Sequence, residues 1–302
     1  MSGKQAESRP HRRAAILFTA ILWGITLLAA TGAVLLFASN VGLTNWEAIR
    51  SLLSDGWFRR SVWLSAATAT TATGIAILVG LPAAYALSRY GFPGKAVLET
   101  LFASVIVLPA STLGLFLMVA FQYPPVLAVQ ERLGFRVVHS LPAIVLAQLP
   151  LAFALGVKAW QATFDAVSPR YEHVARSLGV SAWRAFRTVT LPLARPGIAA
   201  GIILAWTRAV AEFGAALLFA GTFRMRAPGQ FSSISHLLGL NNADLLSLGM
   251  WIEIEGGRTE RGVAIGFVLL LLSALSVLAL MRVTGENRVE ERAHGKWEKS
   301  SA

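Results

Sequence analysis

The stretch from residue 165 to residue 192 reads DAVSPRYEHVARSLGVSAWRAFRTVTLP and predicts two short helices joined by a turn. Pro169 suits the first turn of a helix. Gly179 stands where a helix ends on a left-handed residue, a conformation that glycine adopts without steric strain. Ser181 can cap the second helix with its hydroxyl group, and Pro192 is expected to end that helix.

Long apolar runs lie on both sides of this stretch. Of the 302 residues, 55% are hydrophobic and 14% are charged, whereas a soluble domain carries roughly 25% charged residues. Six runs are long enough to cross a hydrocarbon core about 30 Å thick. Because backbone polar groups in lipid must bond within their own segment, each run is interpreted as a helix. The six predicted spans are residues 14–38, 61–88, 100–121, 140–164, 197–220 and 262–281.

These spans predict an all-α membrane protein in which residues 14–281 form one transmembrane domain, between an N-terminal segment (1–13) and a C-terminal tail (282–302). If both termini lie in the cytoplasm, the cytoplasmic segments hold 16 Lys and Arg residues and the outer segments hold 9. Cytoplasmic loops are usually the more basic ones. We therefore expect a multi-pass protein of the inner (plasma) membrane with both termini cytoplasmic. The net charge of +11 falls in short clusters between apolar runs, which favours contact with anionic lipid over nucleic acid.

Two of the outer segments are expected to have structure of their own. Residues 46–58 are interpreted as an amphipathic helix on the outer surface, where tryptophan favours the membrane–water interface; a packing helix between two spans is the alternative. The last outer segment, 221–261, contains a short apolar stretch at 234–240 and is expected to be partly folded.

The composition also excludes several kinds of site. The chain has no cysteine, so disulfides and thiolate metal sites are impossible. Its histidines and carboxylates do not cluster at metal-ligand spacing, and we predict no metal site. The sequence has no Gly-x-x-x-x-Gly-Lys-Ser/Thr phosphate loop, so the chain is not expected to bind or hydrolyse ATP by itself, and no cofactor is predicted for it.

The stretch quoted first resembles the cytoplasmic signature of the permease subunits of ABC importers. That signature consists of Glu-Ala-Ala, a glycine after three further residues, and a more distant hydrophobic residue followed by Leu-Pro. Val174 and Ala175 stand where the two alanines belong, and His173 takes the place of the glutamate, with Glu172 beside it. The positions that match the spacing are Gly179, Val189, Leu191 and Pro192.

In that family the helix pair seats in a groove of a cytosolic ATPase and passes its movement to the spans. The resemblance therefore implies a type I importer bundle in which residues 171–184 form the coupling helix. It also implies three partners: a cytosolic ABC ATPase dimer that uses ATP and Mg²⁺, an extracytoplasmic solute-binding protein, and a second permease subunit, in a homodimer. The residues assigned to ATPase coupling are Glu172, His173, Ala175, Gly179, Trp183, Leu191 and Pro192.

Two further runs extend the resemblance. The pair at 108–109, Leu-Pro, followed by Gly114, resembles the broken third span of the family. The run Arg-Ala-Val-Ala-Glu-Phe-Gly at 208–214 resembles a run of the molybdate, tungstate and sulfate branch. This resemblance implies import of a tetrahedral oxyanion, with molybdate or tungstate ahead of sulfate or thiosulfate.

The predicted fifth span contains two charges, Arg208 and Glu212, four residues apart and therefore on one helix face. Isolated charges are costly in a bilayer. An internal ion pair is one interpretation, and a position beside the transport pathway, shared with Phe213 and Gly214, is the other. Lys158, near the end of the fourth span, is expected to reach the interface with its amine.

Two other classes of protein remain possible on the residues alone. A secondary transporter, which works without an ATPase, would need coupling-ion groups within its spans, where only Arg208, Glu212 and Lys158 are charged. A membrane-embedded enzyme would need paired catalytic groups at the midplane or the interface, and the sequence contains no such pair.

Overall fold

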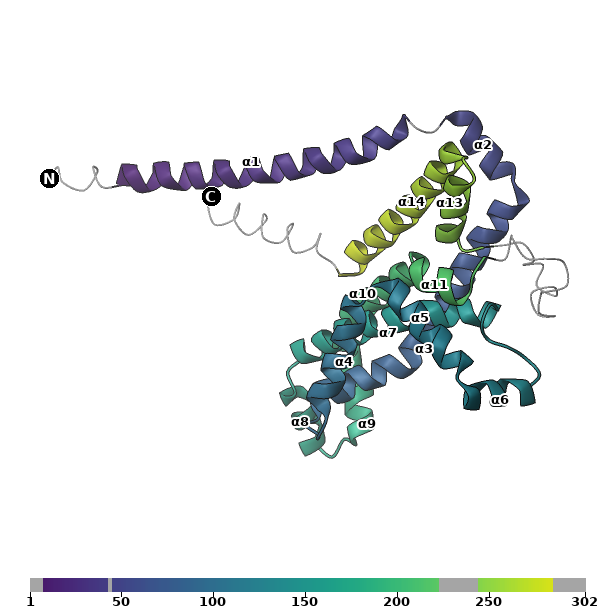
Figure 1. Cartoon of the computed structure of the whole chain (residues 1–302). Helices are drawn as coiled ribbons and strands as arrows, with labels where there is room; N and C mark the ends of the chain where they lie inside the picture. Colours follow the sequence, from purple (N-terminus) through teal and green to yellow (C-terminus); the bar gives the residue numbers. More distant parts are fainter. Residues whose placement is uncertain (1–7, 43–44, 223–243, 285–302) are drawn as a thin grey trace.

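A computed structural model describes residues 8–42, 45–222 and 244–284, and these residues form helices joined by short turns (Figure 1). Five helices are long and apolar enough to cross a membrane, and a bent pair of shorter helices can serve as a sixth span. The prediction of an all-α protein with about six spans is confirmed. The stretch at 234–240 and most of the C-terminal tail lie outside the described residues.

The first long helix, α1 (Ser8–Val41), stands apart from the other helices (Figure 1). Its side chains from residue 17 to residue 35 are exposed. A shorter helix, α2 (Trp46–Ser54), follows it. The predicted helix over 46–58 was wrong at its end, because Asp55 ends α2 and its carboxylate accepts a hydrogen bond from the Trp57 amide at 2.9 Å, which caps the next helix.

The centre of the bundle consists of three helices: α3 (Gly56–Arg89), α7 (Leu141–Ala166) and α10 (Leu191–Val210). Small residues allow them to pack closely. A methyl group at Gly80 of α3 would lie 3.0 Å from the fully buried Trp160 ring of α7. The Trp160 indole N–H donates to a carbonyl of α10, at Ile198, over 3.0 Å.

The predicted third span is broken, as the resemblance implied. Helix α4 (Lys95–Val107) and helix α5 (Ala110–Gln122) meet at a bend of 114° around the Leu-Pro pair at 108–109. Proline has no N–H group to continue the helical ladder and disfavours a helical residue before it. Helix α6 (Pro124–Arg132) then leads into α7.

The predicted fifth span, 197–220, was wrong at both ends. Helix α10 ends at Val210, and after a three-residue break the short helix α11 (Gly214–Phe219) begins. At its start, α10 continues directly from a π-helical turn, η1 (Phe186–Thr190). Pro192 therefore does not end the second helix of the loop as predicted. It occupies the first turn of α10, and the wider π-turn before it tolerates a residue that has no N–H group.

Two further helices close the bundle beside α3 and α10. Helix α13 (Leu246–Glu255) is short and largely buried, and α14 (Thr259–Thr284) is the last predicted span. The Leu246 amide donates to the Ser65 hydroxyl of α3 at 2.9 Å, which fixes the start of α13 against the bundle.

Candidate functional site

The predicted helix–turn–helix at 165–192 is present at one end of the bundle, where α8 and α9 lie (Figure 1). Helix α8 (Arg170–Ser177) is followed by a turn at Gly179, whose φ of +85° is left-handed. The Val180 amide donates to the Ala175 carbonyl at 3.2 Å, as in a glycine-ended helix. The predicted turn is confirmed.

The second helix of this element, α9 (Ala182–Ala185), begins at Ser181, whose hydroxyl accepts a hydrogen bond from the Arg184 amide at 3.4 Å. Large apolar side chains project from both helices into the surroundings. Four of them are 57–79% exposed. They define the apolar tip of the element: Tyr171, Val174, Leu178 and Trp183. His173 is exposed beside them.

The opposite side of α8 carries a buried carboxylate, that of Glu172. It accepts hydrogen bonds from the Thr190 hydroxyl at 2.6 Å, the Tyr85 hydroxyl at 2.8 Å and the Arg89 guanidinium at 3.0 Å. Burial alone would raise the pKa of the Glu172 carboxyl group, but the hydrogen bonds from Thr190, Tyr85 and Arg89 outweigh it and hold that pKa below its usual value.

Arg89 extends this cluster to the end of α7. Besides its bond to Glu172, it donates to the Val167 carbonyl at 2.8 Å. The neighbouring Ser88 hydroxyl donates to Asp165 at 2.5 Å. The last turn of α3 is thereby joined to the end of α7 as well as to α8.

Sequence reasoning placed Glu172 beside the signature but did not identify its partners Tyr85, Arg89 and Thr190. One signal was available, because Glu172 lies three residues before Ala175 and shares its inward face of α8. Ala175 is half-buried, whereas the flanking Tyr171 and Val174 point outward.

The second predicted group, Arg208 to Gly214, lies elsewhere in the bundle, at the break between α10 and α11. An Arg208 guanidinium nitrogen lies 3.0 Å from the Glu212 carboxylate, which is fully buried. The other Glu212 oxygen accepts a hydrogen bond from the Ala215 amide at 2.9 Å and caps α11. The ion pair is present inside the bundle, and a position of these residues beside the transport pathway stays a prediction.

Phe213 and Gly214 have packing roles at this break. The Phe213 ring lies 6.4 Å from the Trp251 ring, between centroids. A methyl group at Gly214 would lie 2.9 Å from the Ser111 amide of α5, and one at Gly114 would lie 2.7 Å from the Ala215 Cα atom of α11. Both glycines are therefore required by the close approach of α5 and α11.

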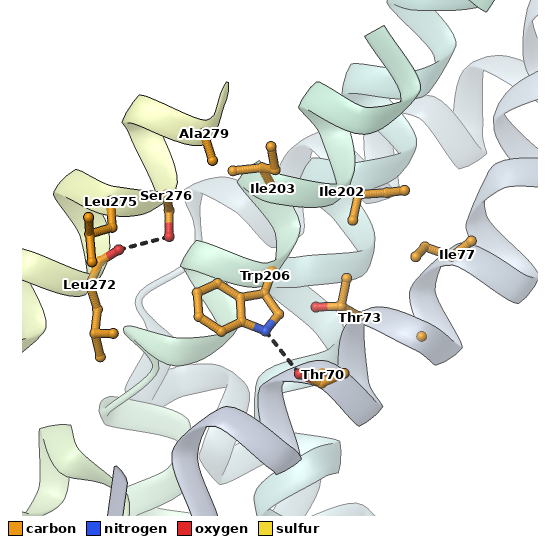
Figure 2. Close-up of a pocket in the computed structure, with 11 residues that line it drawn as sticks. Thr70, Thr73, Ile77, Ile202, Ile203, Trp206, Leu272, Leu275, Ser276 and Ala279 are labelled. Atoms are coloured by element: carbon orange, nitrogen blue, oxygen red, sulfur yellow. Dashed lines mark hydrogen bonds between the residues drawn. The ribbon is translucent and has the colours of Figure 1, made fainter. Parts of the chain in front are cut away.

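A pocket between α3, α10 and α14 lies away from both groups (Figure 2). Its lining is almost entirely apolar, and the Trp206 indole N–H donates to the Thr70 hydroxyl at 3.1 Å within it. No charged side chain lines this pocket, so it offers no group that would attract an anion. Lys158 is half-buried on α7, and its reach to the interface stays a prediction.

For metal sites, the structure describes only part of the chain. Over residues 8–42, 45–222 and 244–284, His, Asp and Glu form no group of three that could hold a metal ion.

The arrangement of broken helices and an end-on helix–turn–helix matches a known family. The family model for the binding-protein-dependent transport system inner membrane component matches residues 76–285. The chain belongs to this family. Its members are multi-pass membrane permeases of ABC importers, so the secondary transporter and the membrane-embedded enzyme are set aside.

Curated relatives carry names of oxyanion transporters. The chain is 37% identical over 174 residues to the molybdate/tungstate transport system permease protein WtpB of Thermococcus kodakarensis, covering 58% of this chain and 66% of that protein. It is 34% identical over 180 residues to the molybdenum transport system permease protein ModB of Escherichia coli K12, covering 57% and 76%. The sulfate transport system permease protein CysT of the same bacterium is 30% identical over 201 residues, covering 65% and 70%. The alignment thus spans just under two thirds of the Thermococcus protein.

Solved structures agree on the fold. The chain superposes on a bacterial alginate ABC transporter, solved with an alginate-bound periplasmic protein, with a TM-score of 0.58 at 17% identity, covering 92% of this chain and 96% of that one. It superposes on the inward-facing MetNI methionine ABC transporter with a TM-score of 0.55 at 16% identity, covering 76% and 94%. The predicted type I importer bundle is confirmed.

Proposed function

We propose that this chain is the permease subunit of an ATP-driven importer of a tetrahedral oxyanion, molybdate or tungstate. The observation that carries the proposal is the end-on element α8–α9, with an apolar tip outside and a buried, multiply bonded carboxylate beneath. Four large apolar side chains exposed together on one element indicate a surface that a partner covers.

The partner that this tip fits is a cytosolic ABC ATPase dimer. The excess of Lys and Arg in the predicted cytoplasmic loops supports a cytoplasmic side for α8, α9 and both termini. ATP and Mg²⁺ are bound by that partner, because this chain has no phosphate loop. The permease itself is not an enzyme; it changes between two conformations whose relative stability the ATPase alters.

A second copy of the chain and an extracytoplasmic solute-binding protein complete the importer. The bacterial alginate ABC transporter, which was solved with a bound periplasmic protein, supports a solute-binding partner for a chain of this fold.

The substrate assignment is supported by the names of the relatives and by the Arg-to-Gly run at 208–214. Arg208 does not present an unpaired cation, since Glu212 neutralises it at 3.0 Å. A pathway that ran past this neutralised pair would release a dianion readily, and selection among oxyanions would then fall to the solute-binding protein. Sulfate or thiosulfate is the second candidate, because the sulfate permease of Escherichia coli K12 is 30% identical.

Uptake into sealed vesicles tests the proposal. The chain is reconstituted with its cognate ATPase and solute-binding protein, and uptake of molybdate, tungstate, sulfate and phosphate is measured with and without ATP. We expect ATP-dependent uptake of molybdate and tungstate. Preference for sulfate would move the assignment to the second candidate, preference for phosphate would overturn both candidates, and ATP-dependent uptake of none of the four anions would overturn the oxyanion assignment.

A further inference from the structure

Glu172 lies where the helix pair α8–α9, the end-on element, meets the long helices, and it accepts hydrogen bonds from both α3 and the π-turn η1 that leads into α10. The donors to its carboxylate are Tyr85 and Arg89 from the last turns of α3, and Thr190 from the end of η1. The side chain of Glu172 is 12% exposed. This carboxylate accepts hydrogen bonds from one charged donor and two hydroxyl groups, and it is largely shielded from water. It is therefore held strongly, because charge-assisted hydrogen bonds are about twice as strong as neutral ones.

The backbone connection between this element and α10 is irregular at the same place. In η1 the Leu191 amide reaches back to the Phe186 carbonyl, one residue further than in an α-helix. Pro192 donates no hydrogen bond at all. Single π-turns inside helices often mark functional positions. The Thr190 hydroxyl, at the end of this turn, donates to Glu172, so a side chain bridges the point where the helical ladder is weakest.

A separate set of contacts attaches the element to the bundle without the carboxylate. The Phe186 ring lies 4.6 Å from the Tyr85 ring and 6.3 Å from the Phe164 ring, between centroids. These contacts between ring faces and edges involve no hydrogen bond, although the Tyr85 hydroxyl also donates to Glu172. They can keep the element attached, whereas the carboxylate determines its orientation.

The geometry points to Glu172 as a positioning residue that fastens α8 to the ends of α3 and α10, so that a displacement of the apolar tip moves both spans together. The inference rests on the proposed function for its consequence, the coupling of ATP hydrolysis to transport. Glu172 touches neither substrate nor nucleotide in this role. It acts through Arg89, Tyr85 and Thr190.

The first test measures the orientation of α8 relative to α3 in the chain of residues 1–302 without its partners. Because the chain has no cysteine, two introduced cysteines, Leu78→Cys on α3 and Ser177→Cys on α8, can each carry a spin label at an exposed position. We expect a narrow distance distribution between the labels. Glu172→Gln should broaden it or add a second distance, because an amide nitrogen, which donates, replaces one of the two oxygens that together accept from three donors.

A carboxylate that is half-buried, that of Glu99, provides a control. Glu99 of α4 accepts a hydrogen bond from Gln161 of α7 at 2.6 Å, away from the end-on element. Glu99→Gln should leave the distance distribution narrow. A distribution that is unchanged in Glu172→Gln would overturn the inference, whether or not the chain transports an oxyanion.

The second test measures coupling in the complete importer in vesicles, as ATP hydrolysed per molybdate imported. Glu172→Gln should raise this ratio on the order of tenfold, which corresponds to the loss of about one hydrogen bond to a charged group. The Glu99→Gln importer should keep the ratio of the unmodified chain. An unmodified importer without ATP-dependent uptake would refute the proposed function, whereas normal coupling in Glu172→Gln would refute only the inference.

If the Glu172 variant fails to accumulate in the membrane, two milder variants replace it. Tyr85→Phe keeps the aromatic ring against Phe186, and Thr190→Val keeps the buried volume; each removes one donor to the carboxylate. Each should raise the ratio of ATP to molybdate several-fold and broaden the label distance. An unchanged ratio and an unchanged distance in both variants would overturn the inference.

Discussion

Among the buried carboxylates that pair with an arginine, Glu212 and Glu172 are built in different ways. Glu212 finds its arginine four residues earlier on the same helix and caps α11 three residues later, so its partners lie within one short run. Glu172 binds Arg89, 83 residues away in the sequence. The first carboxylate shapes one break in a span, and the second joins elements that are distant in the chain.

The largest expected effect concerns the local pair. Glu212→Leu should lower the free energy of unfolding by about 3 kcal/mol or more, because it leaves Arg208 without its carboxylate inside the bundle. Adding Arg208→Leu should recover much of this loss, since no unpaired charge then remains and, among the described residues, the Ala215 amide is the one donor to Glu212 left without its acceptor. Thermal unfolding of the two single variants and the double variant in detergent measures the recovery.

The same cycle at the distant pair should behave differently. Adding Arg89→Leu to Glu172→Leu should recover little, because the hydroxyl groups of Tyr85 and Thr190 still lack their acceptor. Equal recovery at the two sites would show that the additional donors to Glu172 contribute nothing, and that the two carboxylates are alike.

The next effect is steric and belongs to the break beside Glu212. Gly114→Ala should destabilise the protein by about 1–3 kcal/mol, because the new methyl group would lie 2.7 Å from the Ala215 Cα atom, a backbone atom that cannot move independently. Gly74→Ala on α3 is the matched control, since nothing lies within 4 Å of the added methyl group. It should be neutral or slightly stabilising, by up to about 1 kcal/mol. Equal unfolding temperatures for the two variants would contradict the close approach of α5 and α11.

The difference between the two carboxylates also explains which features the sequence could predict. The Gly179 turn, the bend at 108–109 and the ion pair of Arg208 with Glu212 depend on residues within a few positions of one another. Local spacing was enough to predict the turn at Gly179 and to place Arg208 and Glu212 on one helix face, and the resemblance to the importer family implied the bend at 108–109.

Features that depend on tertiary contacts escaped the same reasoning. Hydropathy extends the fifth span to 220, because the residues on both sides of the break after Val210 are mostly apolar. The break is visible only in the structure, where the Ala215 amide donates to Glu212 and a new helix begins. The partners of Glu172 on α3 cannot be inferred without the packing of α8 against that helix. The continuity of η1 into α10 escaped for a related reason, since Pro192 is compatible with either a break or a first turn.

A smaller effect tests the turn that orients the apolar tip. Gly179→Ala should destabilise the element by about 1–2 kcal/mol, because φ at this position is +85°. Gly179→Asn should cost less, since asparagine tolerates the left-handed region better. Uptake should fall in the same order, while Gly91→Ala, at an exposed position with open space around it, should leave uptake unchanged. Equal uptake by all three variants would mean that the left-handed turn at Gly179 is not needed for coupling.

The smallest effect concerns pH and again distinguishes the carboxylate of Glu172. Its pKa in the folded protein lies below the usual value, so its contribution to stability is complete above the unfolded pKa of about 4.3 and is lost as the pH falls through the folded pKa. Between pH 8 and pH 5 the difference in unfolding temperature between the unmodified chain and Glu172→Gln should therefore stay constant. Below about pH 4 the difference should shrink, because the unmodified carboxylate then takes up a proton and loses its charge-assisted bond to Arg89. A difference that already shrinks near pH 6 would mean that the hydrogen bonds do not outweigh the burial of this group, and the contrast with a strongly held, charged Glu172 would not stand.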